Sequence, residues 1–184
     1  MKYPIGIQSF DQIREDGYVY VDKTGLIEYT NSVLDTTNAY ICNSRPRRFG
    51  KSYAANMLAA YYSKGAESEQ MFSGLEISKN TDFKKHLNKY DVIHIDIQWF
   101  LANCDDADNV VPFITKSVLD ELREIYPEFL PLEVTTLPDA LSRIKNCTEQ
   151  KFVVIIDEWD VLIRDVAANK KVQSDYINFL RGMF

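Results

Sequence analysis

Two kinds of hydrophobic pattern alternate along the chain, and each indicates a different type of secondary structure. Strands are predicted where β-branched residues alternate with polar ones or where apolar residues form a short unbroken run. The predicted strands are 18–21, 39–43, 91–97 and 152–156. The last is a continuous apolar run closed by Asp157, which is typical of a central parallel strand covered on both faces.

Helices are predicted where apolar residues recur at three-to-four spacing or where helix-forming residues follow a turn. The segment 112–126 shows the spacing most clearly, with Ile114, Val118 and Leu122 on one face. The other predicted helices are 23–31, 51–63, 137–147 and 173–181. Helices that alternate with apolar strands favour a three-layer α/β domain with a mainly parallel sheet.

Composition places the chain among soluble globular proteins. Of its 184 residues, 46% are hydrophobic and 26% are charged, which excludes a disordered, fibrous or membrane-spanning protein. The formal net charge of -6 provides no overall positive field for nucleic acid or an anionic membrane surface. Any anion-binding site must therefore be local.

The cysteines and the N-terminal residues indicate a cytoplasmic protein without a membrane partner. Cys42, Cys104 and Cys147 are far apart, and no pair has the spacing of zinc ligands or of a disulfide framework. The first residues lead into no apolar stretch of signal-peptide length, and no apolar run is long enough to cross a bilayer.

A basic turn between a predicted strand and a predicted helix resembles a phosphate-binding loop. Residues 45–52 (Arg-Pro-Arg-Arg-Phe-Gly-Lys-Ser) match the last three fixed positions of the pattern G-x-x-x-x-G-K-[ST], with Arg45 in place of its first glycine. Gly50 permits a close approach of the backbone to phosphate, Lys51 would reach the terminal phosphates, and the hydroxyl of Ser52 would join a magnesium shell. The residues predicted to bind the nucleotide are Arg45, Pro46, Arg47, Arg48, Phe49, Gly50, Lys51, Ser52 and Tyr53.

Two other interpretations of the basic turn stay open. The Gly-Lys-Ser sequence also suits the plain beginning of a helix, because short motifs recur by chance. The three arginines, Lys51 and a stacking side chain at Phe49 also suit a nucleic-acid-binding patch. A strand before the turn and a helix after it favour phosphate binding.

The predicted strand 152–156 ends in two carboxylates that suit ATP chemistry. Asp157, at the strand tip, would hold Mg²⁺ directly or through water. Glu158 would point elsewhere along the pleat and orient or deprotonate the water that attacks the γ-phosphate. GTPases of the Ras kind have glycine three residues after the aspartate, whereas this chain has Asp160, so ATP is favoured over GTP. The alternative is a strand end capped by solvated acids.

Several other residues have a functional and a structural interpretation. Asp96, at the end of another predicted strand, is either an additional acid near the site or a structural residue. Phe10, Tyr18 and Tyr20 either line an adenine pocket or pack in the core. The aspartates within 105–108 are predicted to lie in a solvated loop or to cap a helix, since they lack the ligand spacing of a calcium loop.

Four runs together resemble the bacterial AAA-ATPase-like family, many of whose members carry a PD-(D/E)XK nuclease-like domain after the ATPase. The runs are 45–52, 156–160 (Ile-Asp-Glu-Trp-Asp), 20–24 (Tyr-Val-Asp-Lys-Thr) and 179–184 (Phe-Leu-Arg-Gly-Met-Phe). Arg45 in place of the first glycine resembles the family's own pattern, whereas Trp159 stands where the family more often has tyrosine. The resemblance implies an ATP-binding P-loop NTPase fold of the additional-strand, catalytic-glutamate type.

The resemblance also implies that the chain is part of a longer protein. Family members continue into a strand with a polar sensor residue, a helical region and the nuclease-like domain, through which nucleic acid would be a partner. We therefore expect 1–184 to form one domain that lacks its C-terminal part, with a short N-terminal segment 1–38 and a nucleotide-binding core 39–184.

Three functions remain in competition at this point. The first is Mg²⁺-dependent ATP hydrolysis that drives or regulates a nuclease-like domain, with Lys51 and Glu158 as catalytic residues and Ser52 and Asp157 as metal ligands. The second is a nucleotide-gated module that hydrolyses little. The third is a nucleic-acid-binding module that uses the arginine-rich loop.

Overall fold

The computed structural model describes residues 9–44, 49–166 and 169–183. The chain divides into two compact units, Met1–Val92 and Ile93–Phe184. The strand β1 (Asp91–Asp96) begins at the last residues of the first unit and lies mainly in the second.

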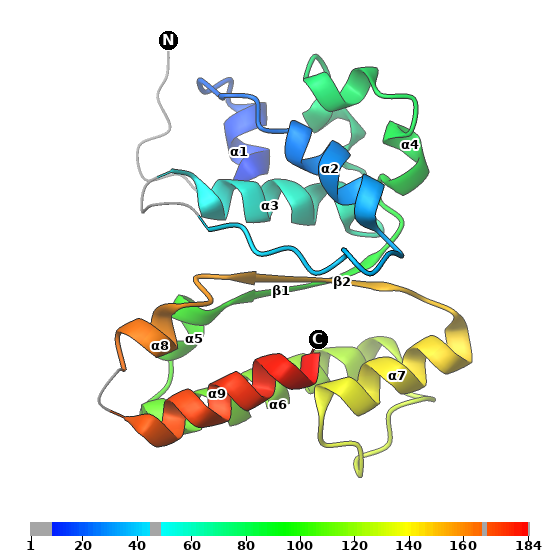
Figure 1. The fold of residues 1–184 in the computed structure, drawn as a ribbon. Coiled ribbons are helices and arrows are strands. Elements are labelled where there is room, and N and C mark those ends of the chain that lie inside the picture. Colours follow the sequence, from blue (N-terminus) through cyan, green and yellow to red (C-terminus); the bar gives the residue numbers. More distant parts are fainter. Residues whose placement is uncertain (1–8, 45–48, 167–168, 184) are drawn as a thin grey trace. The chain divides into compact units, whose positions relative to one another are not determined.

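The regular secondary structure of the first unit is mainly helical (Figure 1). Its described helices are α1 (Phe10–Glu15), α2 (Gly25–Val33), α3 (Lys51–Tyr62), η1 (Ser68–Phe72), η2 (Glu76–Lys79) and α4 (Phe83–His86). Helix α1 packs against α3 and η1, and α2 packs against η2. Helix α3 confirms the helix predicted at 51–63, and α2 confirms the one predicted at 23–31 with both ends shifted by about two residues.

Aromatic side chains form the core of the first unit around α3. The ring of Tyr61 lies 4.9 Å from that of Tyr62, 5.5 Å from that of Phe72 and 5.8 Å from that of Phe83, measured between centroids. The Tyr61 hydroxyl donates to the carbonyl oxygen of Phe83 at 2.7 Å, so the polar end of this buried ring is satisfied. The C-terminal turn of α3 is therefore held by the packing of large rings.

The C-terminal end of α3 is closed by Asn88. Its side-chain amide donates to the carbonyl oxygens of Ser63 at 2.9 Å and Ala60 at 3.2 Å, and its backbone N–H donates to that of Tyr61 at 2.8 Å. No N–H group within the helix donates to these carbonyls, because the last carbonyls of a helix have no following turn to pair with. The left-handed φ of Asn88, 54°, is one that asparagine tolerates better than most residues.

Two predicted strands of the first unit are wrong. At 18–21 the structure has only an isolated bridge at Tyr18, and 39–43 has no regular secondary structure. Tyr40 and Ile41 are 66% and 40% exposed. A strand needs a neighbour that accepts and donates its backbone hydrogen bonds. Among the described residues of this unit, the only strand residues are the first two of β1.

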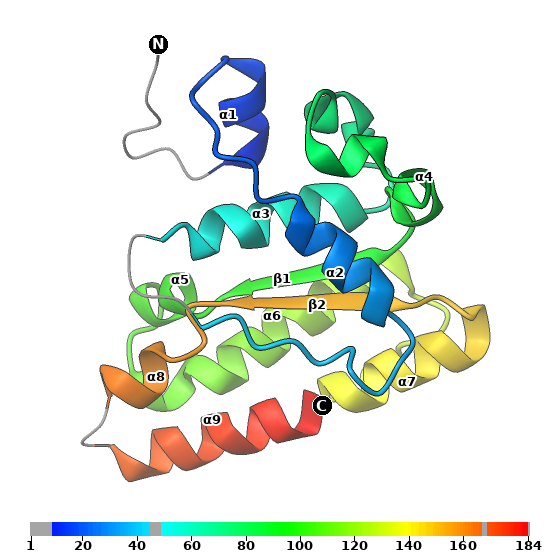
Figure 2. The same cartoon turned by 45° about the horizontal axis from the view of Figure 1, so that its top comes forward.

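The second unit combines two strands with helices (Figures 1 and 2). Its remaining elements are α5 (Ile97–Ala102), η3 (Ala107–Asn109), α6 (Val110–Ile125), α7 (Leu137–Thr148), β2 (Phe152–Asp157), α8 (Val161–Arg164) and α9 (Lys170–Met183). Strands β1 and β2 run parallel, and α6, α7 and α9 lie together on one side of this small sheet. The strands predicted at 91–97 and 152–156 and the helices predicted at 112–126, 137–147 and 173–181 are confirmed, and no end is displaced by more than three residues.

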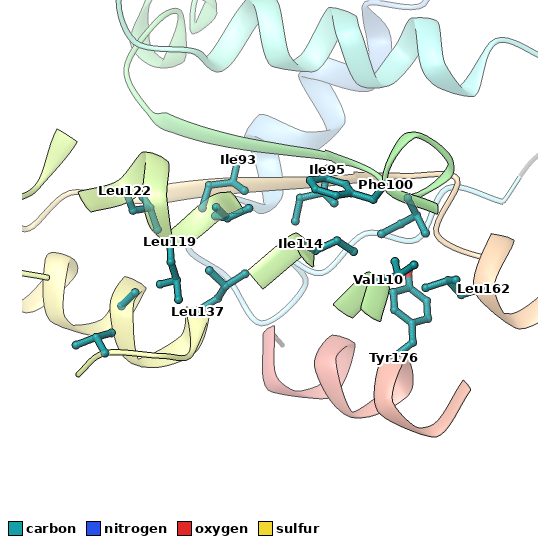
Figure 3. Packing of buried hydrophobic residues seen from close by; sticks show 14 of the residues in the cluster. Ile93, Ile95, Phe100, Val110, Ile114, Leu119, Leu122, Leu137, Leu162 and Tyr176 are labelled. Carbon is teal, nitrogen blue, oxygen red and sulfur yellow. The ribbon is translucent and has the colours of Figure 1, made fainter. Parts of the chain in front are cut away.

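The core of the second unit lies between the sheet and α6. Figure 3 shows Ile93 and Ile95 of β1 pointing toward Ile114 and Leu119 of α6. Alternate residues of a strand face the same side, so these isoleucines share one face of the sheet. The described part of the chain thus has a mixed α/β architecture with a two-stranded parallel sheet.

Replacing Ile114 with alanine is expected to destabilise the second unit by about 2–5 kcal/mol, because the side chain is fully buried and its loss leaves a cavity. Ile125 lies on the same helix but is 65% exposed, so Ile125→Ala is a matched control that should cost less than about 0.5 kcal/mol. Trp99 and Trp159, the two tryptophans of the chain, both lie in this unit. Urea unfolding followed by tryptophan fluorescence therefore measures its stability, and equal losses for the two variants would contradict this core.

Candidate functional site

The predicted phosphate loop meets helix α3 at Gly50. This residue is the N-cap of α3 and has the left-handed angles φ 75° and ψ 41°. Its carbonyl accepts the first helical hydrogen bond, from the N–H of Ala54 at 3.1 Å. Lys51 and Ser52 then form the start of a helix of 12 residues whose first turn contains no acidic side chain. A helix N-terminus carries the positive pole of the helix dipole and N–H groups that the helix itself does not pair, both of which favour an anion.

The rest of the predicted loop is described in part. Phe49 is 62% exposed, and Tyr53 follows Ser52 in the first turn of α3. The residues Arg45, Pro46, Arg47 and Arg48 lie outside the described residues.

Lys23 lies against this helix start, and the sequence did not assign it a role. Its ammonium Nζ donates to the carbonyl oxygen of Phe49 at 2.7 Å. A Cβ atom added at Gly50 would lie 2.5 Å from the same Nζ, much closer than a real contact. Lys23 belongs to the run 20–24, which contributed only to the family resemblance. The sequence Asp-Lys-Thr matches no motif that would predict a lysine beside the phosphate loop.

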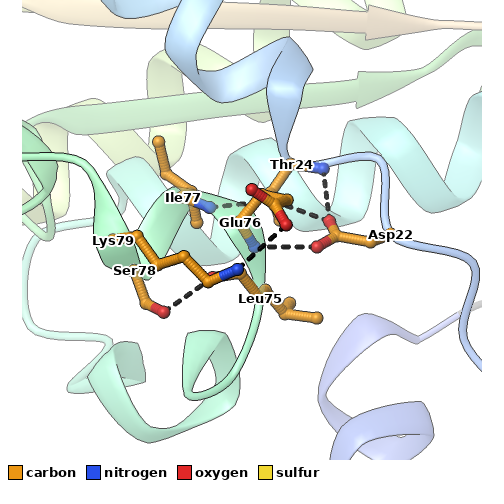
Figure 4. A network of polar contacts seen from close by, with 7 residues as sticks. All are labelled: Asp22, Thr24, Leu75, Glu76, Ile77, Ser78 and Lys79. Atoms are coloured by element: carbon orange, nitrogen blue, oxygen red, sulfur yellow. Dashed lines mark hydrogen bonds and ion pairs between the residues drawn. The ribbon is translucent and has the colours of Figure 1, made fainter.

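Asp22 and Thr24, on either side of Lys23, form a polar clamp on η2 (Figure 4). One carboxylate oxygen of Asp22 accepts from the N–H of Thr24 at 2.8 Å and from its hydroxyl at 2.7 Å. The other accepts from the N–H of Glu76 at 2.8 Å, and the Thr24 hydroxyl oxygen accepts from the N–H of Ile77 at 3.2 Å. The backbone on both sides of Lys23 is therefore fixed to the first turn of η2.

The clamp changes the acidity of Asp22. Burial raises the pKa of this carboxyl, but hydrogen bonds from the Thr24 hydroxyl and from the N–H groups of Glu76 and Thr24 outweigh burial and hold the pKa below its ordinary value of 3.8. The folded state consequently binds this proton less tightly than the unfolded state. The stabilisation is present above the ordinary pKa and is lost as the pH falls through the lowered one.

The acidic pair lies where β2 ends. Asp157, the last residue of β2, is 8% exposed, and its Oδ1 accepts from the N–H of Glu158 at 2.9 Å. Glu158 lies one residue beyond the strand with φ 51°, so the expectation that it continues the pleat is wrong. A left-handed φ is uncommon for a residue with a side chain, and strained conformations are enriched at functional sites. In the described chain Asp35, Glu67, Asn88 and Glu149 adopt it as well.

Side chains from α8 and α9 hold the turn that follows Glu158. The hydroxyl of the buried Tyr176, in α9, donates to the carbonyl oxygen of Trp159 at 2.8 Å. Asp160 accepts from Arg164 at 2.6 Å, and the same guanidinium donates to Asp165 at 2.7 Å. The Asp157–Glu158 corner is thus part of an ordered turn with several anchors.

The other candidate residues make structural contacts in the described chain. Asp96 caps α5, with Oδ1 accepting from the N–H of Trp99 at 3.1 Å, and Asp106 caps η3 by accepting from the N–H of Asp108 at 3.0 Å. Phe10 is fully buried, and its ring lies 5.5 Å from that of Tyr20, which agrees with core packing.

The structure describes the two parts of the predicted site in different units. Lys51 and Ser52 belong to the first unit, and Asp157 and Glu158 belong to the second. Hydroxyl and carboxylate oxygens such as those of Ser52 and Asp157 are ligands that Mg²⁺ accepts. Within residues 9–44, 49–166 and 169–183, no group of three or more His, Cys, Asp or Glu side chains forms a metal site by itself.

Cys42, Cys104 and Cys147 are free thiols. Of the helices that the structure describes, none combines the length and the apolar character needed to cross a membrane.

Comparison with known proteins defines the class. The chain belongs to the AAA-ATPase-like family, whose model, described as "Predicted AAA-ATPase", matches residues 4–184. This confirms the family resemblance and supports a nucleotide-binding ATPase-like domain.

One relative is a protein of Azotobacter chroococcum mcd 1 described as "Uncharacterized protein in vnfD 5'region", which is 28% identical over 190 residues. The match covers 100% of this chain and 34% of that protein, so the chain spans about a third of the relative's length. No solved structure matches the chain.

Removing the carboxylate of the clamp should loosen η2. In Asp22→Ala the amide hydrogen of Glu76 loses its acceptor, and its exchange with solvent at pH 7 should accelerate about tenfold, the effect of a hydrogen bond to a charged group of about 1.5 kcal/mol. Glu28→Ala is the control, since the Glu28 carboxylate accepts from the Asn80 side chain at 3.1 Å and is not part of the clamp. In the wild-type protein, the protection of the Glu76 amide against exchange, measured relative to its intrinsic exchange rate, should also fall as the pH drops below the ordinary pKa of Asp22. Unchanged Glu76 exchange in Asp22→Ala would contradict the clamp.

The left-handed conformation of Glu158 predicts an order of stability among its variants. Glycine adopts this φ without a Cβ clash, whereas a β-branched side chain is strongly disfavoured there. We expect Glu158→Val to be about 1–2 kcal/mol less stable than Glu158→Gly in urea unfolding followed by tryptophan fluorescence. A valine variant as stable as the glycine variant would show that Glu158 does not hold this conformation.

Proposed function

We propose that the chain binds ATP with Mg²⁺ and hydrolyses it. The observation that supports this most directly is the start of α3, where a left-handed Gly50 is followed by Lys51 and Ser52 at the positive end of a long helix. Lys51 would neutralise the terminal phosphates, and Ser52 would coordinate Mg²⁺. The contacts to the nucleotide would be completed by the arginine-rich run Arg45, Pro46, Arg47 and Arg48, together with Phe49 and Tyr53.

The acidic corner of β2 supplies the second half of the proposed chemistry. Asp157 would hold Mg²⁺ directly or through water, and Glu158 would orient the attacking water and accept its proton. The proposal that both corners serve one ATP rests on membership of the AAA-ATPase-like family and on the order of the two motifs. It includes a three-layer P-loop fold with a mainly parallel sheet.

The proposed role of hydrolysis is to drive or regulate an attached nuclease-like domain. This part of the proposal rests on the resemblance described above and on the length of the relative, of which the chain covers 34%. Nucleic acid would then be a partner of the longer protein.

Two substitutions separate binding from turnover. Lys51→Ala should weaken MgATP binding by about 10- to 100-fold, because it removes a charge-assisted contact of about 1.5–3 kcal/mol. Glu158→Gln should bind MgATP within about threefold of wild type but lose at least about 100-fold in steady-state phosphate release, the usual contribution of a general base. Calorimetric titration with MgATP and a phosphate-release assay measure the two quantities.

Each variant has a matched control in its own unit. Lys84→Ala removes an exposed lysine that pairs with Glu69, and Glu149→Gln alters another glutamate with a left-handed φ, 58°. Both should bind and hydrolyse MgATP like wild type. Binding without phosphate release in the wild-type protein would favour a nucleotide-gated switch. Salt-dependent DNA binding that ATP does not affect, with no MgATP binding, would favour a nucleic-acid-binding module and overturn the proposal.

A further inference from the structure

The hydrogen bond from Lys23 sets the orientation of one peptide group in the loop. Its Nζ lies 2.7 Å from the carbonyl oxygen of Phe49, the residue that precedes Gly50. In a planar trans peptide the C=O and the following N–H point in opposite directions. Fixing the Phe49 carbonyl toward Lys23 therefore turns the N–H of Gly50 away from the ammonium group.

The orientation of this peptide matters for an anion. A Phe49 carbonyl that turned toward a phosphate would present partial negative charge and would remove the Gly50 N–H from it. Gly50 is left-handed, and a Cβ at this position would lie 2.5 Å from Lys23 Nζ. The lysine can occupy this place only because residue 50 has no side chain.

The backbone of Lys23 is held independently of the loop. Asp22 binds the N–H of Glu76, and Thr24, which is fully buried, accepts from the N–H of Ile77. These contacts hold the residues on both sides of the lysine, and its side chain reaches the Phe49 carbonyl from there. The side chain itself is only half-buried and contributes little to the core.

We propose that Lys23 is a positioning residue of the nucleotide site, which holds the Phe49–Gly50 peptide in the orientation that offers the Gly50 N–H to the phosphates of ATP. This inference rests on the proposed function. It assigns a role in nucleotide binding to the Asp22–Lys23–Thr24 segment, which precedes the phosphate loop by more than twenty residues.

The test compares MgATP binding by calorimetry in the intact wild-type protein and in three variants. Lys23→Met keeps the length of the side chain but cannot donate, and its dissociation constant should rise by about 10- to 100-fold, the loss expected for a charge-assisted hydrogen bond. Lys23→Arg still donates a hydrogen bond, so it should recover at least half of the change in the logarithm of the dissociation constant. Lys84→Met is the matched control and should stay within about twofold of wild type, because Lys84 pairs with Glu69 in an exposed ion pair.

Thermal unfolding distinguishes positioning from general stability. A positioning role predicts weaker MgATP binding in Lys23→Met with a melting temperature within a few degrees of wild type, together with recovery by arginine. MgATP binding in Lys23→Met within twofold of wild type would overturn the inference and leave the proposed function intact. Equally weak MgATP binding in Lys23→Met and Lys23→Arg would also overturn the inference. This holds even if Lys23→Met is less stable than wild type. Absence of MgATP binding by the wild-type protein would overturn the proposed function itself.

Discussion

The first turn of helix α3 has backbone N–H groups that no carbonyl within the helix accepts, and the proposed site depends on where those groups point. Gly50 sets that direction through its left-handed conformation, and Lys23 fixes the preceding carbonyl. The aromatic core around Tyr61 and the closure of the C-terminal end by Asn88 hold the helix behind this turn. An anion would therefore meet a prepared helix start instead of ordering it on binding.

The two predicted parts of the site share one physical feature. In each, a left-handed residue stands where regular structure begins or ends: Gly50 before α3 and Glu158 after β2. For Gly50 the conformation carries no penalty, whereas for Glu158 it opposes the preference of a residue with a Cβ. The Asp157 carboxylate and the Tyr176 hydroxyl hold the backbone of this strained corner. Strain maintained by surrounding contacts in this way agrees with a functional role for Glu158.

Periodicity predicted the long elements well, because burial of one face imposes a pattern on the sequence. The isoleucines of β1 and the spaced apolar residues of α6 are examples. It failed for 39–43, since apolar composition shows that a segment can enter a sheet but not that a partner strand is present. It also missed α5, whose six residues follow a strand directly and are too few to show a helical period.

The candidate site was predictable only where a motif is continuous in sequence. Gly50, Lys51 and Ser52 were found from their spacing, and the structure places them at the start of a helix as expected. Lys23 was not found, because its contact with Phe49 joins residues 26 positions apart and its neighbours Asp22 and Thr24 act through backbone groups of η2. Contacts of this kind depend on tertiary packing and leave no spacing in the sequence.

The most direct test of the central claim is the response of the Gly50 amide to nucleotide. The chain has seven glycines, and Gly50 is the only one preceded by phenylalanine, so ¹⁵N-glycine and ¹³C-carbonyl phenylalanine labelling identifies its amide signal without mutation. Phosphate binding at the start of α3 predicts that saturating MgATP shifts this signal strongly and that adenosine with Mg²⁺, which lacks phosphates, does not. A Gly50 amide signal that MgATP leaves unchanged would contradict phosphate binding at the start of α3.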